Sequence, residues 1–369
     1  MESLLEIEPL NNWFEGINYP LIIAGPCSAE TEEQVLSTAK SLAKTKQVSV
    51  LRAGIWKPRS RPGNFEGAGE EGLKWLNRVK NETGLKVAIE VATPAHVELA
   101  LKNNIDMVWI GARTTANPFS VEQLAAALKS TNIPVLVKNP VTPDIELWIG
   151  AIERFNKVGI TKLAAIHRGF FPYERSRLRN IPKWELAIDL KSRLPKLPLI
   201  SDPSHIAGKR ELVQEIAQHA IDLSYDGLMV EVHPNPPTAL SDSRQQLDFK
   251  EFEHMLNSLN FHKLATGDSN FTDQLETIRN QIDSIDQQIL ELLGNRMRLI
   301  EKIGEYKRDK NVTIIQLRRW EKILESRIEC GQKLGLSEEY IKSLLRLVHK
   351  ESIKRQAEIL RGKPDTNGE

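Results

Sequence analysis

The chain is poor in cysteine, in net charge and in long apolar runs, and each shortage excludes a class of protein. Two cysteines in 369 residues cannot build a disulfide framework, so we expect a reducing, cytoplasmic setting. A formal net charge of +1 provides no global basic field for nucleic acid or a membrane surface. No apolar run approaches the ~20 residues of a membrane span. The N-terminus "MESLLEIEPLNNWFEG" lacks the basic start and apolar core of a signal peptide.

Short apolar runs alternate with amphipathic stretches from residue 20 to about residue 260. The runs are β-branched and apolar on both faces, which predicts strands of a buried parallel sheet at 21–25, 48–54, 86–91, 106–111, 134–138, 162–168, 198–202 and 227–233. Eight strands with intervening helices match a (β/α)8 TIM barrel. A doubly wound open sheet is the competing fold, but no Gly-rich dinucleotide fingerprint follows the first strand.

The rhythm of the sequence changes near residue 262, where polar "HKLATGDSN" predicts a linker over 262–270. Beyond it there are no strand signals, and the 3–4 spacing of apolar residues predicts helices near 271–309, 314–332 and 337–361. We therefore expect an α/β chain: a barrel over 1–261, then a small all-α three-helix domain over 271–361 and a polar tail over 362–369. The long apolar seam of the first helix predicts a homodimer formed through this domain.

Four metal-capable side chains fall at the ends of neighbouring barrel strands, where this fold places its chemistry. Cys27 follows the first strand, His205 follows the seventh, and Glu231 and Asp242 belong to the eighth and its loop. A thiolate, an imidazole and two carboxylates suit one divalent transition metal such as Mn, Fe, Co or Zn. The alternative is a buried apolar cysteine among unrelated polar loop residues.

The remaining strand ends carry cations, namely Arg52, Lys57, Arg59, Arg113, Lys138 and Arg168. Six cations at one barrel mouth would repel one another unless anions bind between them, and Arg and Lys suit phosphate and carboxylate. Separately solvated surface cations are the alternative; this fits Arg59 well but fits Lys138 poorly, because "PVLVK" is typical of a buried strand. The barrel sequence suggests a metal-dependent enzyme acting on phosphorylated or carboxylated small molecules.

Seven motifs, in chain order "AGPCS", "LRAGIWKPRS", "IGAR", "VLVK", "ISDPSH", "MVEVHP" and "SDSRQQLDF", resemble 3-deoxy-D-arabino-heptulosonate 7-phosphate (DAHP) synthases of the I-beta type over about 20–255. This resemblance implies the four metal ligands named above. It implies contacts to phosphoenolpyruvate from Arg52, Lys57, Arg113, Lys138 and Arg168, to which we add Glu90 of the third strand, and contacts to erythrose 4-phosphate from Lys57, Arg59 and Ser60. The sister family that makes the eight-carbon Kdo sugar phosphate usually has Lys-Ala-Asn where this chain has "KPR", which points to the four-carbon aldehyde. His167 of "HRGF" stands where many relatives carry glutamate, and its role stays open.

The implied reaction is an aldol-like condensation in which the metal polarises the aldehyde, carbon 3 of phosphoenolpyruvate attacks it, water adds at carbon 2 and phosphate leaves. The rival mechanism is that of a class I aldolase with Lys138 as Schiff-base nucleophile.

The seam of the first C-terminal helix is apolar at every position except Arg296, and a cation at a core position is costly without a partner. Lys307 lies eleven residues later on nearly the same face, so both would line one pocket for a small dianion. Arg279 lies roughly 100° round the helix and could reach a partner's pocket instead. A dimerising bundle whose cations pair with glutamates is the alternative.

The segment from about 275 to 357 resembles the all-helical (AroQ-type) chorismate mutase. The resemblance implies substrate contacts from Arg279 (given to the partner subunit), Arg296, Lys307, Gln316, Arg319, Ser352 and Gln356, with no cofactor. Trp320 stands where the family usually has glutamate, and Gln316 where it commonly has an acid. We therefore also consider a non-catalytic domain that senses prephenate or chorismate. The fusion suggests a bifunctional shikimate-pathway enzyme under feedback by prephenate.

Overall fold

The computed structural model describes residues 5–57, 63, 65–173, 176–261, 269–314 and 317–361, without the side chains of 269–270 and 317–319. The chain divides into two compact units, residues 1–264 and 265–369, and each unit is considered by itself. In the part of the chain that is described, no helix is both long enough and apolar enough to span a bilayer.

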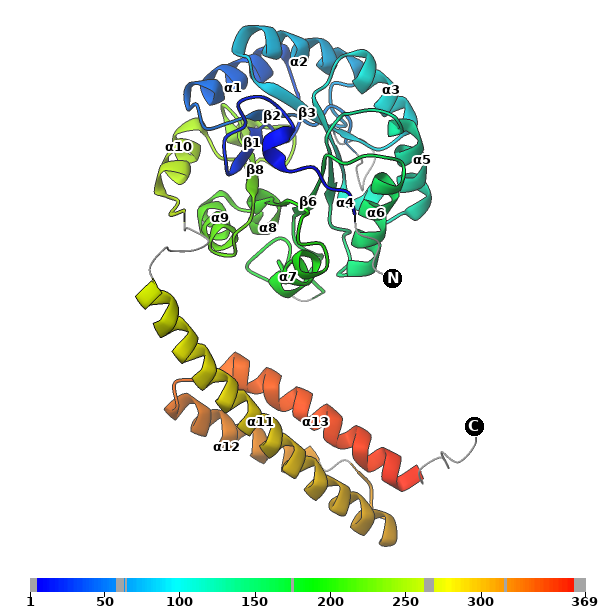
Figure 1. Ribbon diagram of the computed structural model, residues 1–369, viewed down its shortest axis with the longest axis vertical. Helices are drawn as coiled ribbons and strands as arrows, with labels where there is room; N and C mark the ends of the chain where they lie inside the picture. Colours follow the sequence, from blue (N-terminus) through cyan, green and yellow to red (C-terminus); the bar gives the residue numbers. More distant parts are fainter. Residues whose placement is uncertain are drawn as a thin grey trace. The chain divides into compact units, whose positions relative to one another are not determined.

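Eight parallel strands close into a barrel in the first unit, in the order β1 to β8, with β1 hydrogen-bonded to β8 (Figure 1). The strands are β1 (Leu21–Gly25), β2 (Val50–Arg52), β3 (Lys86–Val91), β4 (Met107–Ile110), β5 (Val135–Lys138), β6 (Leu163–His167), β7 (Leu199–Ser201) and β8 (Gly227–Glu231). This confirms the predicted TIM barrel and excludes the open sheet. Several strands are shorter than predicted, β2 and β8 above all: β2 lacks 48–49 and 53–54, and β8 lacks 232–233.

Helices ring the strands, as Figure 1 shows. They are α1 (Glu32–Lys44), α2 (Glu70–Thr83), α3 (Pro94–Lys102), α4 (Ala112–Thr115), α5 (Pro118–Leu128), α6 (Ile145–Lys157), α7 (Trp184–Arg193), α8 (Pro203–Ala207), α9 (Val213–Asp222) and α10 (Phe249–Ser258), with 3-10 turns η1 (Leu10–Asn12), η2 (Arg210–Leu212) and η3 (Pro236–Thr238). Most of the longer helices begin at a side-chain cap. Thr31 and Thr93 accept from the backbone of α1 and α3, and Asp248 forms a capping box with Glu251.

The barrel has two apolar shells, one on each side of its sheet. The outer shell lies between strands and helices, and the inner shell fills the barrel with residues such as Ile23, Met107 and Ile200. The N-terminal segment, dark blue in Figure 1, adds Leu10 and Trp13 to the inner shell. Since its contacts reach residues that precede β2 and β6, it closes the barrel at the end opposite to the strand C-termini.

The alternation of the strands sets which polar residues enter the barrel. In six strands, an inner-shell residue is followed two positions later by a polar one. The inner-shell residues are Val50, Ala88, Leu136, Ile166, Ile200 and Met229. These second positions are Arg52, Glu90, Lys138, Arg168, Asp202 and Glu231. The period of two therefore presents a ring of charges at the C-terminal mouth, directly above the apolar filling.

The second unit contains α11 (Ser269–Asp309), α12 (Leu317–Lys333) and α13 (Glu338–Arg361). The first of these helices begins two residues earlier than predicted. The helices α11 and α13 run in the same direction: Arg296 contacts Ser352, and further along Gly304 faces Ile359. Gly304 permits this approach, because a Cβ there would lie 3.1 Å from the Ile359 side chain.

Candidate functional site

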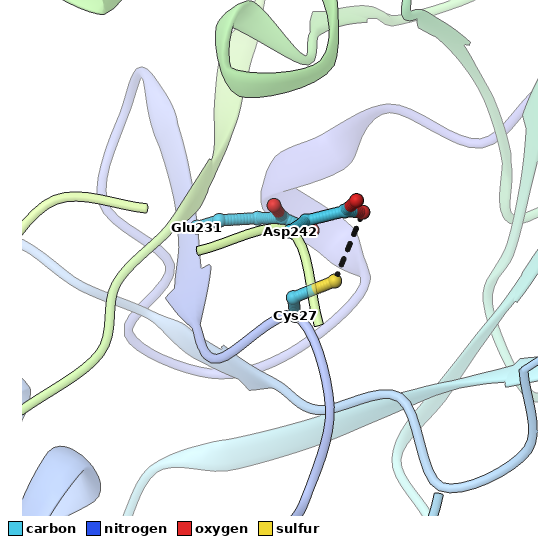
Figure 2. Close-up of side chains that lie close together, drawn as sticks. All are labelled: Cys27, Glu231 and Asp242. Atoms are coloured by element: carbon cyan, nitrogen blue, oxygen red, sulfur yellow. Dashed lines mark hydrogen bonds between the residues drawn. The ribbon is translucent and has the colours of Figure 1, made fainter. Parts of the chain in front are cut away.

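Three predicted metal ligands meet at the barrel mouth (Figure 2). One ligand atom from each of Cys27, Glu231 and Asp242 lies within 4.8 Å of the others, and no second cluster of this kind occurs among the described residues. Cys27 Sγ lies 3.3 Å from Asp242 Oδ2, the contact drawn as a dashed line in Figure 2. Both Cys27 and Glu231 are fully buried. Residues more than 200 positions apart in the chain thus form one thiol–carboxylate centre.

A glycine before Cys27 fixes the position of its loop. Gly25 has φ of 149°, and a Cβ there would lie 2.1 Å from the carbonyl oxygen of Arg52, so a larger residue could not fit. The backbone N–H of Cys27 donates to Gln246 Oε1 at 2.9 Å. Asp242 adopts φ of 46°, a left-handed conformation that Asp tolerates better than most residues. The two loops are therefore held together by backbone geometry as well as by their side chains.

The fourth predicted ligand, His205, lies at the edge of this centre on α8. Its Nε2 is 3.8 Å from Glu231 Oε1 and 3.9 Å from Asp242 Oδ2. Its Nδ1–H donates to the carboxylate of buried Asp202, at 3.0 Å from Oδ1 and 2.8 Å from Oδ2. A carboxylate behind one ring nitrogen turns the lone pair of the other toward a metal, which is the usual arrangement around a ligating histidine.

Asp202 also serves the cation set, because its Oδ2 accepts from Lys138 Nζ at 2.7 Å. Burial opposes ionisation of Asp202, but the hydrogen bond from His205 and the charge of Lys138 outweigh burial and hold its pKa well below the usual range. Burial lowers the pKa of His205, which favours the neutral imidazole that a metal needs. The Asp202 carboxylate therefore connects His205, a predicted metal ligand, to Lys138, a predicted substrate contact.

The Arg52 guanidinium is buried beside Glu231, with Nη2 at 3.3 Å from Oε1. Its plane lies against Trp109, 4.9 Å from the ring centroid. Arg52 Nε and Nη1 have no hydrogen-bond partner among the described residues, nor has Glu231 Oε1. Buried donors and a buried acceptor without partners are costly, so this part of the mouth is built to receive an anion next to a cation.

Lys57 and Arg179 complete the charge balance around the centre. Lys57 Nζ donates to the carbonyl oxygen of Cys27 at 3.0 Å and contacts its sulfur. Arg179 Nη1 lies 3.1 Å from Asp242 Oδ1 and also donates to Gln245, whose side chain donates to Glu231 Oε2 at 2.7 Å. Positive and amide groups thus surround the thiol and both carboxylates.

The electrostatics of the centre suit a cation. Burial and the Glu231 charge raise the pKa of the Cys27 thiol to about 12. Burial opposes ionisation of Glu231 and Asp242, yet the surrounding positive groups hold both pKa values below their usual range. Two ionised carboxylates, a neutral imidazole and a thiol that a bound metal would deprotonate are a fitting donor set for a divalent transition metal.

Arg168 and Arg113 approach the mouth from β6 and α4. Arg168 Nη1 donates to Asn180 Oδ1 at 2.8 Å, and its backbone N–H donates to Asn139 Oδ1 at 2.7 Å. Burial lowers the pKa of Arg168 to about 10, and the Arg113 charge contributes to this shift, so the two cations are near each other. Mutual repulsion of this kind is relieved by a bound anion.

Glu90 sits below these cations and is held by the inner shell. Its Oε2 accepts from Trp109 Nε1–H at 3.2 Å. Gly111 makes room for it, since a Cβ at that position would lie 2.1 Å from Glu90 Oε1. The third strand therefore contributes an acid to the same mouth. Arg59 and Ser60, the predicted phosphate contacts, lie outside the described residues.

His167 is turned away from the mouth. It is fully buried on the outer side of the barrel, where Nε2–H donates to the Pro182 carbonyl oxygen and Nδ1 accepts from Tyr225 Oη–H at 2.8 Å. Trp184 packs edge-on against its ring, with centroids 5.2 Å apart. Successive side chains along a strand point to opposite faces, and the next residue, Arg168, points into the barrel. His167 is therefore a core histidine and not a substrate contact.

In the helical unit, Arg296, Ser352 and Gln356 meet between α11 and α13. Arg296 Nη1 donates to Ser352 Oγ at 2.6 Å, while Ser352 and Gln356 are buried. Gln356 Oε1 is buried without a hydrogen-bond partner among the described residues. Lys307 Nζ donates to the Ile314 carbonyl oxygen. Arg279 pairs with Glu276 on the surface. Gln316 and the Arg319 side chain lie outside the described residues.

Sequence reasoning did not select Asp202, Arg179, Gln245 or Trp109. A signal was present for Asp202, which stands two residues after inner-shell Ile200 and in phase with the other inward charges. Trp109 follows Met107 in the same way. Arg179 and Gln245 lie on loops, where no period assigns a direction.

We predict that a His167→Gln variant has a stability less sensitive to acid than the wild type. The pKa of His167 is about 4 in the folded barrel, below its ordinary value of 6.5, because burial disfavours the charged ring. Between these values only the unfolded chain binds the proton, so stability falls as pH falls. Between about pH 7 and pH 5, the free energy of unfolding of the wild type should fall by about 2 kcal/mol more than that of His167→Gln.

Urea unfolding of both proteins at the two pH values measures this difference. Glutamine is chosen because its side chain can still donate to the Pro182 carbonyl oxygen. His254→Gln, an exposed position on α10, is the matched control. An equal pH dependence in wild type and His167→Gln would show that His167 is not the titrating group.

Comparison with known proteins agrees with this geometry. The model of the DAHP synthetase I family matches residues 5–264, and that of chorismate mutase type II matches residues 278–357. The phospho-2-dehydro-3-deoxyheptonate aldolase of Thermotoga maritima is 35% identical over 248 residues, which cover 66% of this chain and 70% of that relative. A 2-dehydro-3-deoxyphosphooctonate aldolase of Desulfotalea psychrophila is 29% identical over 265 residues, covering 65% of this chain and 88% of the relative.

The crystal structure of the Thermotoga maritima DAHP synthase superposes with a TM-score of 0.59 at 34% identity, covering 64% of this chain and 67% of that one. A truncated form of the same synthase gives a TM-score of 0.56 at 32% identity, covering 64% of this chain and 84% of that one. The chain therefore belongs to the DAHP synthetase I family and continues into a chorismate mutase domain, which makes it a bifunctional enzyme of the shikimate pathway.

Proposed function

We propose that the barrel condenses phosphoenolpyruvate with erythrose 4-phosphate in a reaction that depends on one divalent metal ion. The observation that carries this proposal is the convergence of Cys27, Glu231 and Asp242 within 4.8 Å, with His205 Nε2 aimed at the two carboxylates. These four residues would hold the ion, and Mn, Fe, Co and Zn all accept such donors. When bound, the ion supplies Lewis acidity that polarises the aldehyde.

Phosphoenolpyruvate is proposed to bind among Arg52, Lys57, Glu90, Arg113, Lys138 and Arg168. Support comes from the unpartnered N–H groups of buried Arg52 and from the crowding of Arg168 and Arg113. Arg forks match the carboxylate and phosphate groups of the ligand. Held this way, the ligand would turn carbon 3 toward the aldehyde, and the cations would stabilise charge as water adds at carbon 2 and phosphate leaves.

The aldehyde is proposed to approach from the side of Lys57. A cavity of about 400 Å³ opens there, lined in part by Lys57, Trp56 and His96. Trp56 and His96 stack with ring centroids 4.1 Å apart and so fix the segment that leads to Arg59 and Ser60. The preference for a four-carbon aldehyde rests on the sequence "KPR" alone.

The contacts of Lys138 favour a role as a fixed charge rather than a Schiff-base nucleophile. Its ammonium group is buried against the Asp202 carboxylate at 2.7 Å, and its Nζ lies 5.9 Å from the Trp109 ring centroid. A lysine nucleophile must have its amine free to attack a carbonyl, whereas Nζ of Lys138 already donates to the Asp202 carboxylate.

We predict that EDTA abolishes DAHP formation and that Mn(II) restores it. The same sample should convert chorismate to prephenate at an unchanged rate, because that reaction is proposed to need no cofactor; this serves as the internal control. Phosphate release and chorismate loss are the two measurements. Full condensation activity in a demonstrably metal-free sample, together with covalent trapping of substrate by borohydride, would contradict the metal route and support Lys138 as nucleophile.

The helical unit is proposed to rearrange chorismate in the pocket between α11 and α13. Arg296, Lys307, Ser352 and Gln356 of one chain would contact the substrate together with Gln316 and Arg319, and Arg279 would enter from the partner subunit. Buried Gln356 Oε1 lacks a donor among the described residues, which supports a ligand there. Positive charge and conformational restraint would accelerate the rearrangement without a covalent step.

A homodimer through the helices is proposed from the exposed apolar seam of α11. Ile278, Ile282, Ile285 and Ile289 are each exposed by about half, at 53%, 51%, 54% and 48%. A contiguous apolar face of this kind on a soluble unit is typical of an interface. The seam stands on the helix that carries Arg279, so pairing of the seams would bring each Arg279 toward the other chain.

We predict that Ile285→Glu converts the dimer to a monomer, because a carboxylate on the seam cannot be buried without a partner. Chorismate turnover should fall at least tenfold through loss of the partner's arginine, while DAHP formation persists. Sedimentation analysis and both assays measure these effects. Gln287→Glu adds the same charge on the same helix at an exposed polar position and should change neither. A dimeric and fully active Ile285→Glu protein would contradict the proposed interface.

Feedback is proposed because one chain carries an early and a late reaction of the same pathway. Prephenate held in the helical pocket would restrain the barrel.

We predict that prephenate slows DAHP formation in the full chain and fails to do so in Arg296→Ala, which removes a pocket cation. Initial rates over a prephenate series measure the effect, and an unchanged rate in the wild type would contradict feedback by this ligand.

A reducing, cytoplasmic location is proposed as well. Both cysteines are free, Cys27 buried and Cys330 exposed. A ligand thiol would need reducing conditions to remain available for a metal.

A further inference from the structure

Trp320 and His349 form a stacked pair at the proposed mutase pocket. Their ring centroids lie 4.0 Å apart with an interplanar angle of 15°, one ring from α12 and the other from α13. Trp320 is the residue at which this chain departs from the mutase pattern, so the pair is a feature of this chain that the pattern does not account for. Both rings are partly buried.

His349 lies on the face of α13 that forms the pocket. Ser352 and Gln356 follow it at three and then four residues, a spacing that places three side chains on one face of a helix. Arg296 donates to Ser352 Oγ at 2.6 Å. Burial and the Arg296 charge both lower the pKa of His349, which indicates that the imidazole lies near this guanidinium.

Among the described residues, none forms a hydrogen bond with the ring nitrogens of His349. The ring face of His349 is covered by Trp320. A neutral imidazole both donates and accepts. Gln356 Oε1, two helical turns away on the same face, is a buried acceptor without a partner.

The neighbouring cations suit the two carboxylates of chorismate or prephenate, since guanidinium and ammonium groups only donate. Besides an oxygen that only accepts, namely the ether oxygen of chorismate or the keto oxygen of prephenate, the remaining polar group of these ligands is a ring hydroxyl, which both donates and accepts. A neutral imidazole matches a hydroxyl in both roles, whereas the Trp320 face matches neither. The chemistry therefore assigns the carboxylates to the cations and the hydroxyl to a neutral partner.

We propose that His349 is a further substrate-contacting residue of the mutase pocket, which hydrogen-bonds the ring hydroxyl of chorismate, and that Trp320 is a positioning residue that holds the imidazole edge-on to the ligand. This rests on the proposed mutase pocket. The pair supplies a contact that the tryptophan itself cannot make.

The test compares His349→Leu, His349→Gln, Trp320→Leu and Trp320→Phe in the full-length dimer. His349→Leu should raise the KM for chorismate roughly five- to tenfold, the effect of one lost hydrogen bond, with a smaller change in kcat. His349→Gln should recover most of the affinity because it keeps a donor and an acceptor. Trp320→Phe should retain stacking and near-normal KM, whereas Trp320→Leu should resemble His349→Leu.

A chorismate analogue without the ring hydroxyl makes the assignment specific. Wild type and His349→Leu should bind this analogue with equal affinity, while they differ for chorismate. His254→Leu, at an exposed histidine of the barrel, is the matched control. Far-UV circular dichroism and sedimentation show whether each variant keeps its helices and its dimer.

The outcomes separate the two levels of the argument. If His349→Leu changes the KM for chorismate less than twofold while Arg296→Ala abolishes turnover, the pocket stands and the role of His349 is wrong. An equal loss of affinity for chorismate and for the analogue would also overturn it, because the loss would then be structural. If Arg296→Ala leaves turnover unchanged, the proposed pocket itself is wrong, and with it the contact.

Discussion

The buried carboxylate of Asp202 is the contact on which the barrel mouth depends. It accepts from His205 on one side and from Lys138 on the other, and is itself fully buried. A buried charge is tolerated only when it is paired and hydrogen-bonded, and here His205 Nδ1 lies within 3.0 Å of both oxygens while Lys138 donates to Oδ2. Asp202 thus neutralises Lys138, a predicted substrate contact, and orients His205, a predicted metal ligand. Because one side chain serves both, the metal ligands and the substrate cations cannot be rearranged independently.

The same principle extends around the mouth through Glu231. This carboxylate meets Arg52 at 3.3 Å and Gln245 at 2.7 Å, yet its Oε1 has no hydrogen-bond donor among the described residues. Beside it, Arg52 keeps two N–H groups without partners. The neighbouring positive and amide groups keep the carboxylates ionised. Because one carboxylate oxygen still lacks a donor, the site can bind a cation, and because two N–H groups of Arg52 lack acceptors, it can also bind an anion.

The helical unit follows a different physical logic. Its polar residues line one face of α13 beside Arg296, and its seam on α11 leaves isoleucines half exposed. Among the described residues of this unit, Ile341 is the one hydrophobic side chain that is buried, so little apolar core lies within one chain. A unit of this kind would gain stability from the proposed partner subunit and from an anionic ligand in the proposed pocket.

The sequence by itself determined the architecture and most of the charged mouth. Alternating apolar runs predict a parallel sheet, and the missing dinucleotide fingerprint favours its closed form. A strand period of two decides which side chain enters the barrel, so Arg52, Lys138 and Glu231 were predictable and Asp202 could have been. The same period shows why His167 faces outward beside inward Arg168. Only the tertiary structure decided the loop partners Arg179 and Gln245 and the stack of Trp320 on His349. Loops have no period, and a contact between two helices depends on their rotation and separation, which local sequence does not encode.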